Sequence, residues 1–149
     1  MIAHLILVAL LAVGNLPDPH LTPGVVNPAV TQANIHSTIC VPGYSKSIRP
    51  PNSYTRQLKL KQLSGGPYRS NLGPQAFEED HLISLELGGH PTDPRNLWPQ
   101  HWSTPLGARE KDRLENYLHT QVCSGHMTLK AAQTAISSNW ITTFKGVRL

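Results

Sequence analysis

FEEDHLISLELGGHPTDPRNLWPQH, residues Phe77–His101, is the most informative part of the sequence. It places a carboxylate and an imidazole side by side at Asp80 and His81, passes through a Gly-Gly pair, and returns to Asn96 before the final histidine. A carboxylate is a ligand for hard cations, and an imidazole exchanges a proton near neutral pH. The stretch therefore holds the side chains of a small metal-dependent site.

Two short strands joined by a broad loop are predicted within this stretch. Imperfect apolar alternation over Glu78–Leu87 is typical of a short strand, and the glycines at positions 88 and 89 end it. The HPTDP segment that follows contains two prolines, which do not pair regularly in a sheet. The second strand is predicted over Asn96–Pro99.

Two amphipathic helices are predicted after the stretch. Leu106–Val122 carries apolar residues at three- and four-residue steps, so they share one face, and Lys111 is placed away from that face. Thr128 is a suitable N-cap for a last helix, in which Leu129 and Trp140 share a side. These helices are expected to form the scaffold of the core.

The segment before the stretch, residues 15–75, is predicted to be a loop-rich arm with one helix. Prolines at its beginning favour an extended, irregular course. Ile39–Val41 is consistent with a short strand, and residues 43–51 with a loop. The one helix is predicted over Ser53–Leu63, with Ser53 as its N-cap.

Residues 1–14 are predicted to be a cleaved export signal. The apolar run Leu5–Val13 is too short to span a bilayer, and Ala12-Val13-Gly14 offers the small residues that a signal peptidase prefers. No Lys or Arg precedes the run, so a buried N-terminal strand or helix is the alternative. Export implies a secreted or periplasmic protein with no membrane attachment after cleavage.

The chain has two cysteines, Cys40 and Cys123. In an oxidising compartment they can pair, and a bridge that closes a loop of this length contributes roughly 4 kcal/mol in the loop-entropy model. Two independent buried thiols are the alternative. A zinc site is a poorer fit, because the chain has no CxxC pair to supply closely spaced thiolates.

The order and type of these residues resemble the HNH endonucleases, also called ββα-metal or His-Me finger nucleases. The resemblance lies in Asp-His-Leu-Ile from residue 80, the Gly-Gly turn, Asn96-Leu97 and the amphipathic helix, and it covers Phe77 to about Leu118. It implies an α+β chain in which a ββα-metal finger is embedded in a small, mainly helical domain. The expected units are the arm over 15–75 and the finger with its last helix over 76–149.

A looser likeness covers other parts of the chain. The segments Asn27–Gln32 and Thr38–Cys40, and the spacing of charged and cysteine residues from Lys111 to Cys123, look like small exported bacterial proteins that are grouped with these nucleases. This likeness favours the same fold and names no substrate.

The resemblance assigns roles to three residues of the stretch. In the family the aspartate of the Asp-His pair binds the metal and the histidine is the general base, which gives these roles to Asp80 and His81. The later asparagine either orients the loop that carries the base or joins the metal shell, and Asn96 matches it. Adjacent residues on a strand face opposite sides, so the base and the metal would flank a substrate phosphate placed between them.

His101 is the candidate for the last metal ligand, although it lies closer to the asparagine than the family's ligand does. Glu110, Asp112 or a water molecule are the alternatives in that position. The expected cofactor is one divalent metal ion, Mg²⁺ in the first place, with Mn²⁺, Zn²⁺ or Ni²⁺ as alternatives. Such an ion polarises a phosphoryl oxygen and stabilises the leaving alkoxide.

The leading hypothesis is therefore a metal-dependent endonuclease that hydrolyses DNA, or RNA, with little sequence specificity, and that acts as a monomer. A formal net charge of +4 agrees with a polyanionic partner. The residues expected to be exposed and to contact phosphates are Arg95, Arg109, Lys111 and Arg113. The most basic part of the chain surrounds Ser53–Leu63 and is either a solvated face or a further contact with the nucleic-acid backbone.

Two other hypotheses belong to different classes of protein. The chain can have kept the finger fold as a non-catalytic module that binds nucleic acid or an envelope component. It can also be a small, disulfide-linked exported protein with no site, in which Asp80 and His81 form a structural pair at a strand end. Cleavage of plasmid DNA that is lost in His81→Ala separates the enzyme from both.

Overall fold

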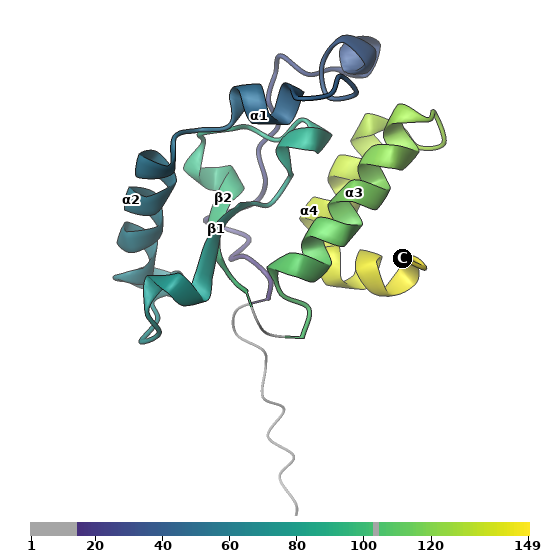
Figure 1. Cartoon of the computed structure of the whole chain (residues 1–149). Helices are drawn as coiled ribbons and strands as arrows, with labels where there is room; N and C mark the ends of the chain where they lie inside the picture. The colour runs from purple at the N-terminus through teal and green to yellow at the C-terminus, as the bar shows by residue number, and fades with distance from the viewer. Residues whose placement is uncertain (1–14, 103–104) are drawn as a thin grey trace, which may run out of the picture.

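The computed structural model describes residues 15–102 and 105–149, and its fold combines helices with a small two-stranded sheet, as an α+β chain should. The regular elements are α1 (Tyr44–Ile48), α2 (Asn52–Leu63), β1 (Phe77–His81), β2 (Leu97–His101), α3 (Ala108–Cys123) and α4 (Leu129–Gly146). Short 3₁₀ turns join them. Figure 1 shows α2 on one side of the β1–β2 pair and the antiparallel helices α3 and α4 on the other.

The sheet is an antiparallel pair with a defined register. Phe77 lies opposite His101 and His81 lies opposite Leu97, so every residue of β1 has a partner on β2. The first strand is shorter than predicted, because the chain leaves the sheet after His81 and forms a 3₁₀ turn at Leu85–Leu87. The apolar residues beyond His81 are buried in this turn, and an apolar run is compatible with either structure.

The Gly-Gly pair makes this turn possible. Gly88 has a φ of 75°, in the left-handed region that glycine adopts without strain. Gly89 lies so close to the strand end that a Cβ at this position would be 1.7 Å from the carbonyl oxygen of Ile83. The arm packs against the same turn: Val26 forms a β-bridge with Gly89, and His90 N donates to Val25 O at 2.8 Å.

The main core lies between α3, α4 and the turn after β1. It contains Leu114, Leu118, Ile136 and Trp140, each at most 1% exposed. α4 begins as predicted, with the Thr128 side chain accepting a hydrogen bond from Ala131 N at 3.1 Å. α3 begins two residues later than predicted, at Ala108, because Leu106 has a φ of 64° and lies outside the helix.

The arm contains more helix than the sequence predicts. The pattern of residues 43–51 favours a loop, but Tyr44–Ile48 forms α1. No strand forms at Ile39–Val41, where Cys40 N donates to Ile35 O in a turn instead. α2 matches its prediction apart from its start, since Pro51 and not Ser53 is the N-cap.

A disulfide joins the arm to α3. Cys40 and Cys123 are bonded with an S–S distance of 2.02 Å, across 83 residues of sequence, which confirms the expected pairing over two free thiols. No helix of residues 15–102 and 105–149 is both long and apolar enough to cross a membrane. The predicted export signal, residues 1–14, lies outside the described residues.

Candidate functional site

Asp80 and His81 point to different elements, as strand neighbours should. Asp80 reaches α3, where its carboxylate lies 2.7 Å from the ammonium group of Lys111. His81 lines a pocket whose opposite wall includes residues of α2. The two side chains are therefore not a structural hydrogen-bonded pair with each other; each has its own partner.

The His81 ring is fixed by the loop between the strands. Its Nε2 lies 2.9 Å from the carbonyl oxygen of Pro91. A carbonyl only accepts hydrogen bonds, so Nε2 carries the proton and Nδ1 of the neutral ring has an unprotonated lone pair. Burial lowers the pKa of the imidazole, against the opposing effects of the Pro91 hydrogen bond and of Asp80. His81 is therefore a neutral proton acceptor at physiological pH.

Asn96 holds that loop in place. Its side-chain oxygen accepts from Ile83 N at 3.0 Å, and its amide donates to Ile83 O at 3.0 Å and to His90 O at 3.1 Å. The residue is fully buried. Of the two roles expected for Asn96, this geometry supports the one that orients the loop.

The pocket beside His81 lies between α2 and β1, and we call it the α2–β1 pocket. Its volume is about 390 Å³. Its titratable lining consists of Arg49, Arg56, Lys59, Glu78, Glu79 and His81. Basic residues of α2 and of the segment before it are thus next to the imidazole.

Two glutamates of this pocket, Glu78 and Glu79, are partly buried. Burial, with the nearby charge of Asp80, raises the pKa of Glu78 to about 7 and that of Glu79 to about 8. Both carboxyl oxygens of Glu79 are buried and have no hydrogen-bond partner among the described residues. Glu79 is therefore a protonated carboxyl group at neutral pH, which can act as a proton donor.

The carboxylate predicted to bind a metal is instead held by an internal cation. Lys111 is completely buried, and its Nζ contacts Asp80 and Glu115 and donates to His81 O at 2.8 Å. Burial disfavours its charge, but the two carboxylates outweigh this effect and raise the pKa of Lys111.

The prediction that Lys111 is exposed and contacts phosphate is therefore wrong. It lies three residues before Leu114 and seven before Leu118, so it shares their buried face of α3. This spacing is visible in the sequence, but the charge of a lysine argues against a buried position there.

The predicted metal ligands do not converge. His101 lies opposite Phe77, with the two rings 5.3 Å apart, whereas Asp80 lies opposite Trp98. These two positions are three residues apart along the strand, which corresponds to roughly 10 Å. Asn96 uses its amide within the loop, so a cation held jointly by Asp80, Asn96 and His101 does not fit this arrangement.

The two alternative candidates for the last metal ligand, Glu110 and Asp112, lie on α3 and have interactions of their own. Glu110 accepts a hydrogen bond from Gly107 N at 3.0 Å and so caps the start of α3. Asp112 lies on α3, and partial desolvation of its carboxyl group together with the charge of Asp80 raises its pKa. Among the described His, Cys, Asp and Glu residues, the group that could hold a metal ion is Cys40, His119 and Cys123.

The other expected phosphate contacts lie away from the α2–β1 pocket. Arg95 is exposed and forms an ion pair of 2.6 Å with Asp93. Arg109 is exposed, and Arg113 places its guanidinium 5.7 Å from the centre of the Phe144 ring. None of them lines the pocket, whose cations come from α2 and the residues before it.

The α2–β1 pocket therefore combines a neutral imidazole, a protonated carboxyl group and three cationic side chains, and this set is suited to acid–base chemistry on an anionic substrate. Glu79 and His81 lie two residues apart on the same strand, roughly 7 Å along it.

A scan of protein-family models, a search of the curated proteins and a search of the solved structures return no match for this chain.

Proposed function

We propose that the protein hydrolyses phosphodiester bonds of nucleic acid in the α2–β1 pocket, with His81 as the general base. The observation that carries the proposal is the hydrogen bond from His81 Nε2 to Pro91 O, which leaves Nδ1 as the proton acceptor. The ring lines a pocket that also contains Arg49, Arg56 and Lys59. The residues support the HNH-type assignment through the base and the loop asparagine, and not through a metal site.

The positions of these groups support the following sequence of steps. Nδ1 of His81 takes a proton from water, and the oxygen of that water attacks phosphorus. The cations of the pocket bind the non-bridging phosphate oxygens and stabilise the charge that develops on them. The bond from phosphorus to the leaving oxygen breaks, and Glu79 donates its proton to that oxygen. The resemblance to HNH nucleases implies products with 3′-hydroxyl and 5′-phosphate ends.

No step is assigned to a divalent cation. A bound cation would supply charge stabilisation on the phosphate, but the expected ligands Asp80, Asn96 and His101 do not meet at one point. Activity measured in Mg²⁺, in Mn²⁺ and in a chelator decides whether the reaction depends on a metal held elsewhere in the pocket.

The experiment compares cleavage of supercoiled plasmid, single-stranded DNA and RNA by the purified protein and two variants. His81→Ala is expected to lower the rate by about 100-fold or more, because general-base catalysis contributes at least this factor. His126→Ala is the matched control, since this exposed histidine lies beyond the end of α3 and hydrogen-bonds Ser124 at 2.7 Å. Equal cleavage by the protein and its His81 variant would rule out the assignment.

A non-catalytic nucleic-acid-binding module is the second candidate, and the Lys111 ion pair favours it. The ammonium group neutralises Asp80 internally, so the carboxylate has a structural role without any metal. In that case the basic wall of the pocket still binds the phosphate backbone. A salt-dependent mobility shift without cleavage in any cation would identify the protein as a binder.

We also infer that the protein works in an oxidising compartment outside the cytoplasm. The Cys40–Cys123 disulfide supports this, because such bonds persist where thiols are not kept reduced. Cell fractionation with N-terminal sequencing tests it. Mature protein beginning at Asn15 is expected, and full-length protein retained in the cytoplasm contradicts it.

A further inference from the structure

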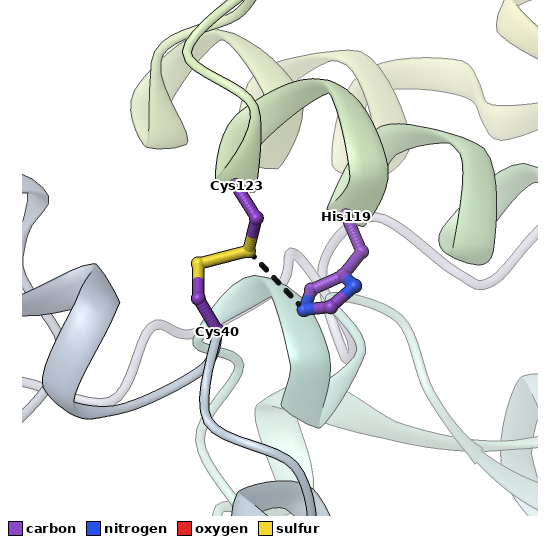
Figure 2. A group of neighbouring side chains, drawn as sticks. All are labelled: Cys40, His119 and Cys123. Carbon is purple, nitrogen blue, oxygen red and sulfur yellow. Dashed lines mark hydrogen bonds between the residues drawn. A yellow bond between two sulfur atoms is a disulfide. The ribbon is translucent and has the colours of Figure 1, made fainter.

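A second group of ligand-type side chains lies where the arm meets α3, away from the α2–β1 pocket. Figure 2 shows Cys40 on the arm and His119 and Cys123 one helical turn apart on α3. One ligand atom from each residue lies within 4.8 Å of the other two. All three residues are partly accessible to solvent, so a small molecule can reach them.

In the oxidised protein this group does not bind a metal. The two sulfur atoms are bonded to each other. His119 Nε2 lies 2.9 Å from Ile39 O, so it carries a proton and donates to that carbonyl, and it lies 3.4 Å from Cys123 Sγ. While the disulfide is intact, the cluster therefore offers no thiolate and no lone pair on His119 Nε2.

We propose that reduction of the Cys40–Cys123 disulfide converts this cluster into a binding site for a divalent cation of the zinc type, with two thiolates and one imidazole as ligands. A dithiol supplies two electrons and two protons to the disulfide and is itself oxidised to a disulfide. Each cysteine then loses its proton as it binds the cation, and His119 binds through Nε2 after its ring proton moves to Nδ1. Two negative charges from the thiolates balance the cation.

The backbone around the cluster is already arranged for such a site. His119 and Cys123 are four residues apart on one helix, so their side chains lie on the same face. The turn that carries Cys40 is held by the hydrogen bond from Cys40 N to Ile35 O, which does not depend on the disulfide. The sulfur atoms have to separate from 2.02 Å to roughly 3.8 Å, the spacing of two thiolates on one tetrahedral zinc ion.

The cluster also has room for a fourth ligand. A pocket of about 440 Å³ borders Cys40 and His119, and the side chain of Glu86 lines the same pocket. A water molecule or the Glu86 carboxylate can complete a tetrahedral shell there, as in sites with three protein ligands. The disulfide and the metal are alternative ways to join the arm to α3, and the redox state selects between them.

Titration of the whole protein with Co²⁺, a spectroscopic substitute for Zn²⁺, tests the proposal. The protein is reduced without oxygen by a phosphine that does not compete for the metal, and the excess is removed. One equivalent of Co²⁺ is expected to bind, with a thiolate-to-cobalt charge-transfer band and the strong visible bands of tetrahedral cobalt, and Zn²⁺ should abolish both. A carboxylate site elsewhere gives no such charge-transfer band, so it cannot imitate the result.

Variants separate the three ligands from the rest of the surface. His119→Ala is expected to weaken binding of Co²⁺ at least about tenfold, while His126→Ala, at an exposed position just beyond the end of α3, leaves it unchanged. Cys40→Ser should remove half of the charge-transfer intensity. The oxidised protein should bind no Co²⁺ with these bands.

The test also gives a clear result if the reduced protein unfolds before metal is added. Circular dichroism follows the helices throughout the titration, and recovery of helix on addition of one equivalent of Zn²⁺ supports the site. Three results would overturn it: a reduced, folded protein without the charge-transfer band, a His119→Ala variant that binds as tightly as the parent, or an unfolded protein that the metal does not restore.

Discussion

At the scale of single residues, the ionisation of His81 and Glu79 fixes the pH dependence of the proposed reaction. His81 has to be neutral and Glu79 has to be protonated, so activity falls on both sides of an optimum. Burial lowers the pKa of His81, so on the acid side the rate should fall only below the usual pKa of histidine. On the alkaline side the rate should fall near the Glu79 pKa of about 8.

Initial rates of cleavage between pH 4 and 10 measure these limbs. Glu79→Gln is expected to lower the maximum rate and to remove the alkaline limb. An acid limb clearly above the usual histidine pKa of about 6.5 would contradict the assignment of His81.

The same Glu79 affects stability in the opposite sense to most carboxylates. Its folded-state pKa of about 8 lies above the ordinary value of 4.5, so the folded state binds the proton more tightly between these values. The stabilisation is complete below pH 4.5 and is lost as pH rises through about 8. Glu79→Gln keeps an uncharged group and should therefore be more stable than the parent at pH 9, by about 4 kcal/mol, and close to it at pH 5.

Urea unfolding at pH 5 and pH 9 gives this difference. The two proteins share every other titrating group, so the effects of those groups cancel. The quantity compared is therefore the difference in free energy of unfolding between variant and parent, and how it changes from pH 5 to pH 9. A Glu79→Gln variant that gains no stability relative to the parent at pH 9 would show that Glu79 is ionised in the folded protein at neutral pH.

Lys111 is the residue whose removal should be most damaging to the fold. Lys111→Met leaves Asp80 and Glu115 without their shared cation, and breaking a buried ion pair in this way costs roughly 3–5 kcal/mol. Combining Lys111→Met with Asp80→Asn and Glu115→Gln should recover most of the loss, because no uncompensated charge remains. Thermal and urea unfolding measure both effects.

Arg109→Met is the matched control for Lys111. Arg109 lies on the same helix two residues earlier and is exposed, so its replacement should change stability by less than about 0.5 kcal/mol. Equal effects of the two substitutions would mean that the buried ion pair contributes nothing to stability.

At the scale of the elements, α2 should determine the affinity for nucleic acid. Arg56 lines the α2–β1 pocket, whereas Lys61 lies in the last turn of the same helix and does not. Arg56→Ala is expected to reduce the slope of log affinity against log salt by about 1, as the loss of one phosphate contact should. Lys61→Ala should leave the slope nearly unchanged.

Fluorescence anisotropy of a labelled oligonucleotide, at several salt concentrations, provides the slopes. The comparison is informative because both substitutions remove one positive charge from one helix. Similar slopes for the two variants would indicate diffuse attraction to the net charge instead of contact in the pocket.

The elements are predictable where local periodicity determines them. α2, α3 and α4 have their apolar residues or caps at the spacing of a helix, and the predicted beginning of each lies within two residues of the observed one. The predicted β1 is too long, because the buried turn after His81 is as apolar as a strand. α1 escapes prediction, since its five residues YSKSI lack a buried apolar residue and an N-cap side chain.

The site is predictable only in part, for a physical reason. The positions of His81 and Asn96 follow from the short stretch that contains them, because the strands and the loop are local. The partner of Asp80 lies 31 residues away on α3, and the cations of the pocket come from before β1. Such long-range contacts depend on tertiary packing, which cannot be predicted from a local sequence pattern.

At the scale of the whole molecule, the disulfide is expected to contribute much of the stability. It closes a loop across 83 residues, which corresponds to about 4.5 kcal/mol in the chain-entropy model. The double variant Cys40→Ser with Cys123→Ser should lose a free energy of unfolding of this order, with little change in helix content. Urea unfolding of the variant, in the absence of metal, gives the value.

A control for this variant is the parent protein treated with a reductant under the same conditions. The two should agree, since both lack the covalent link. A loss below about 1 kcal/mol in both would mean that the arm is held to α3 by packing and hydrogen bonds alone.

The contact between Asn15 and the last helix, α4, has a consequence for the order of folding. Trp140 Nε1 donates to Asn15 O at 2.7 Å, across 125 residues of sequence. Asn15 therefore cannot make this hydrogen bond until the ribosome has released α4. Until α4 has been synthesised, the growing polypeptide lacks this contact, so the final packing of the fold waits for the end of synthesis.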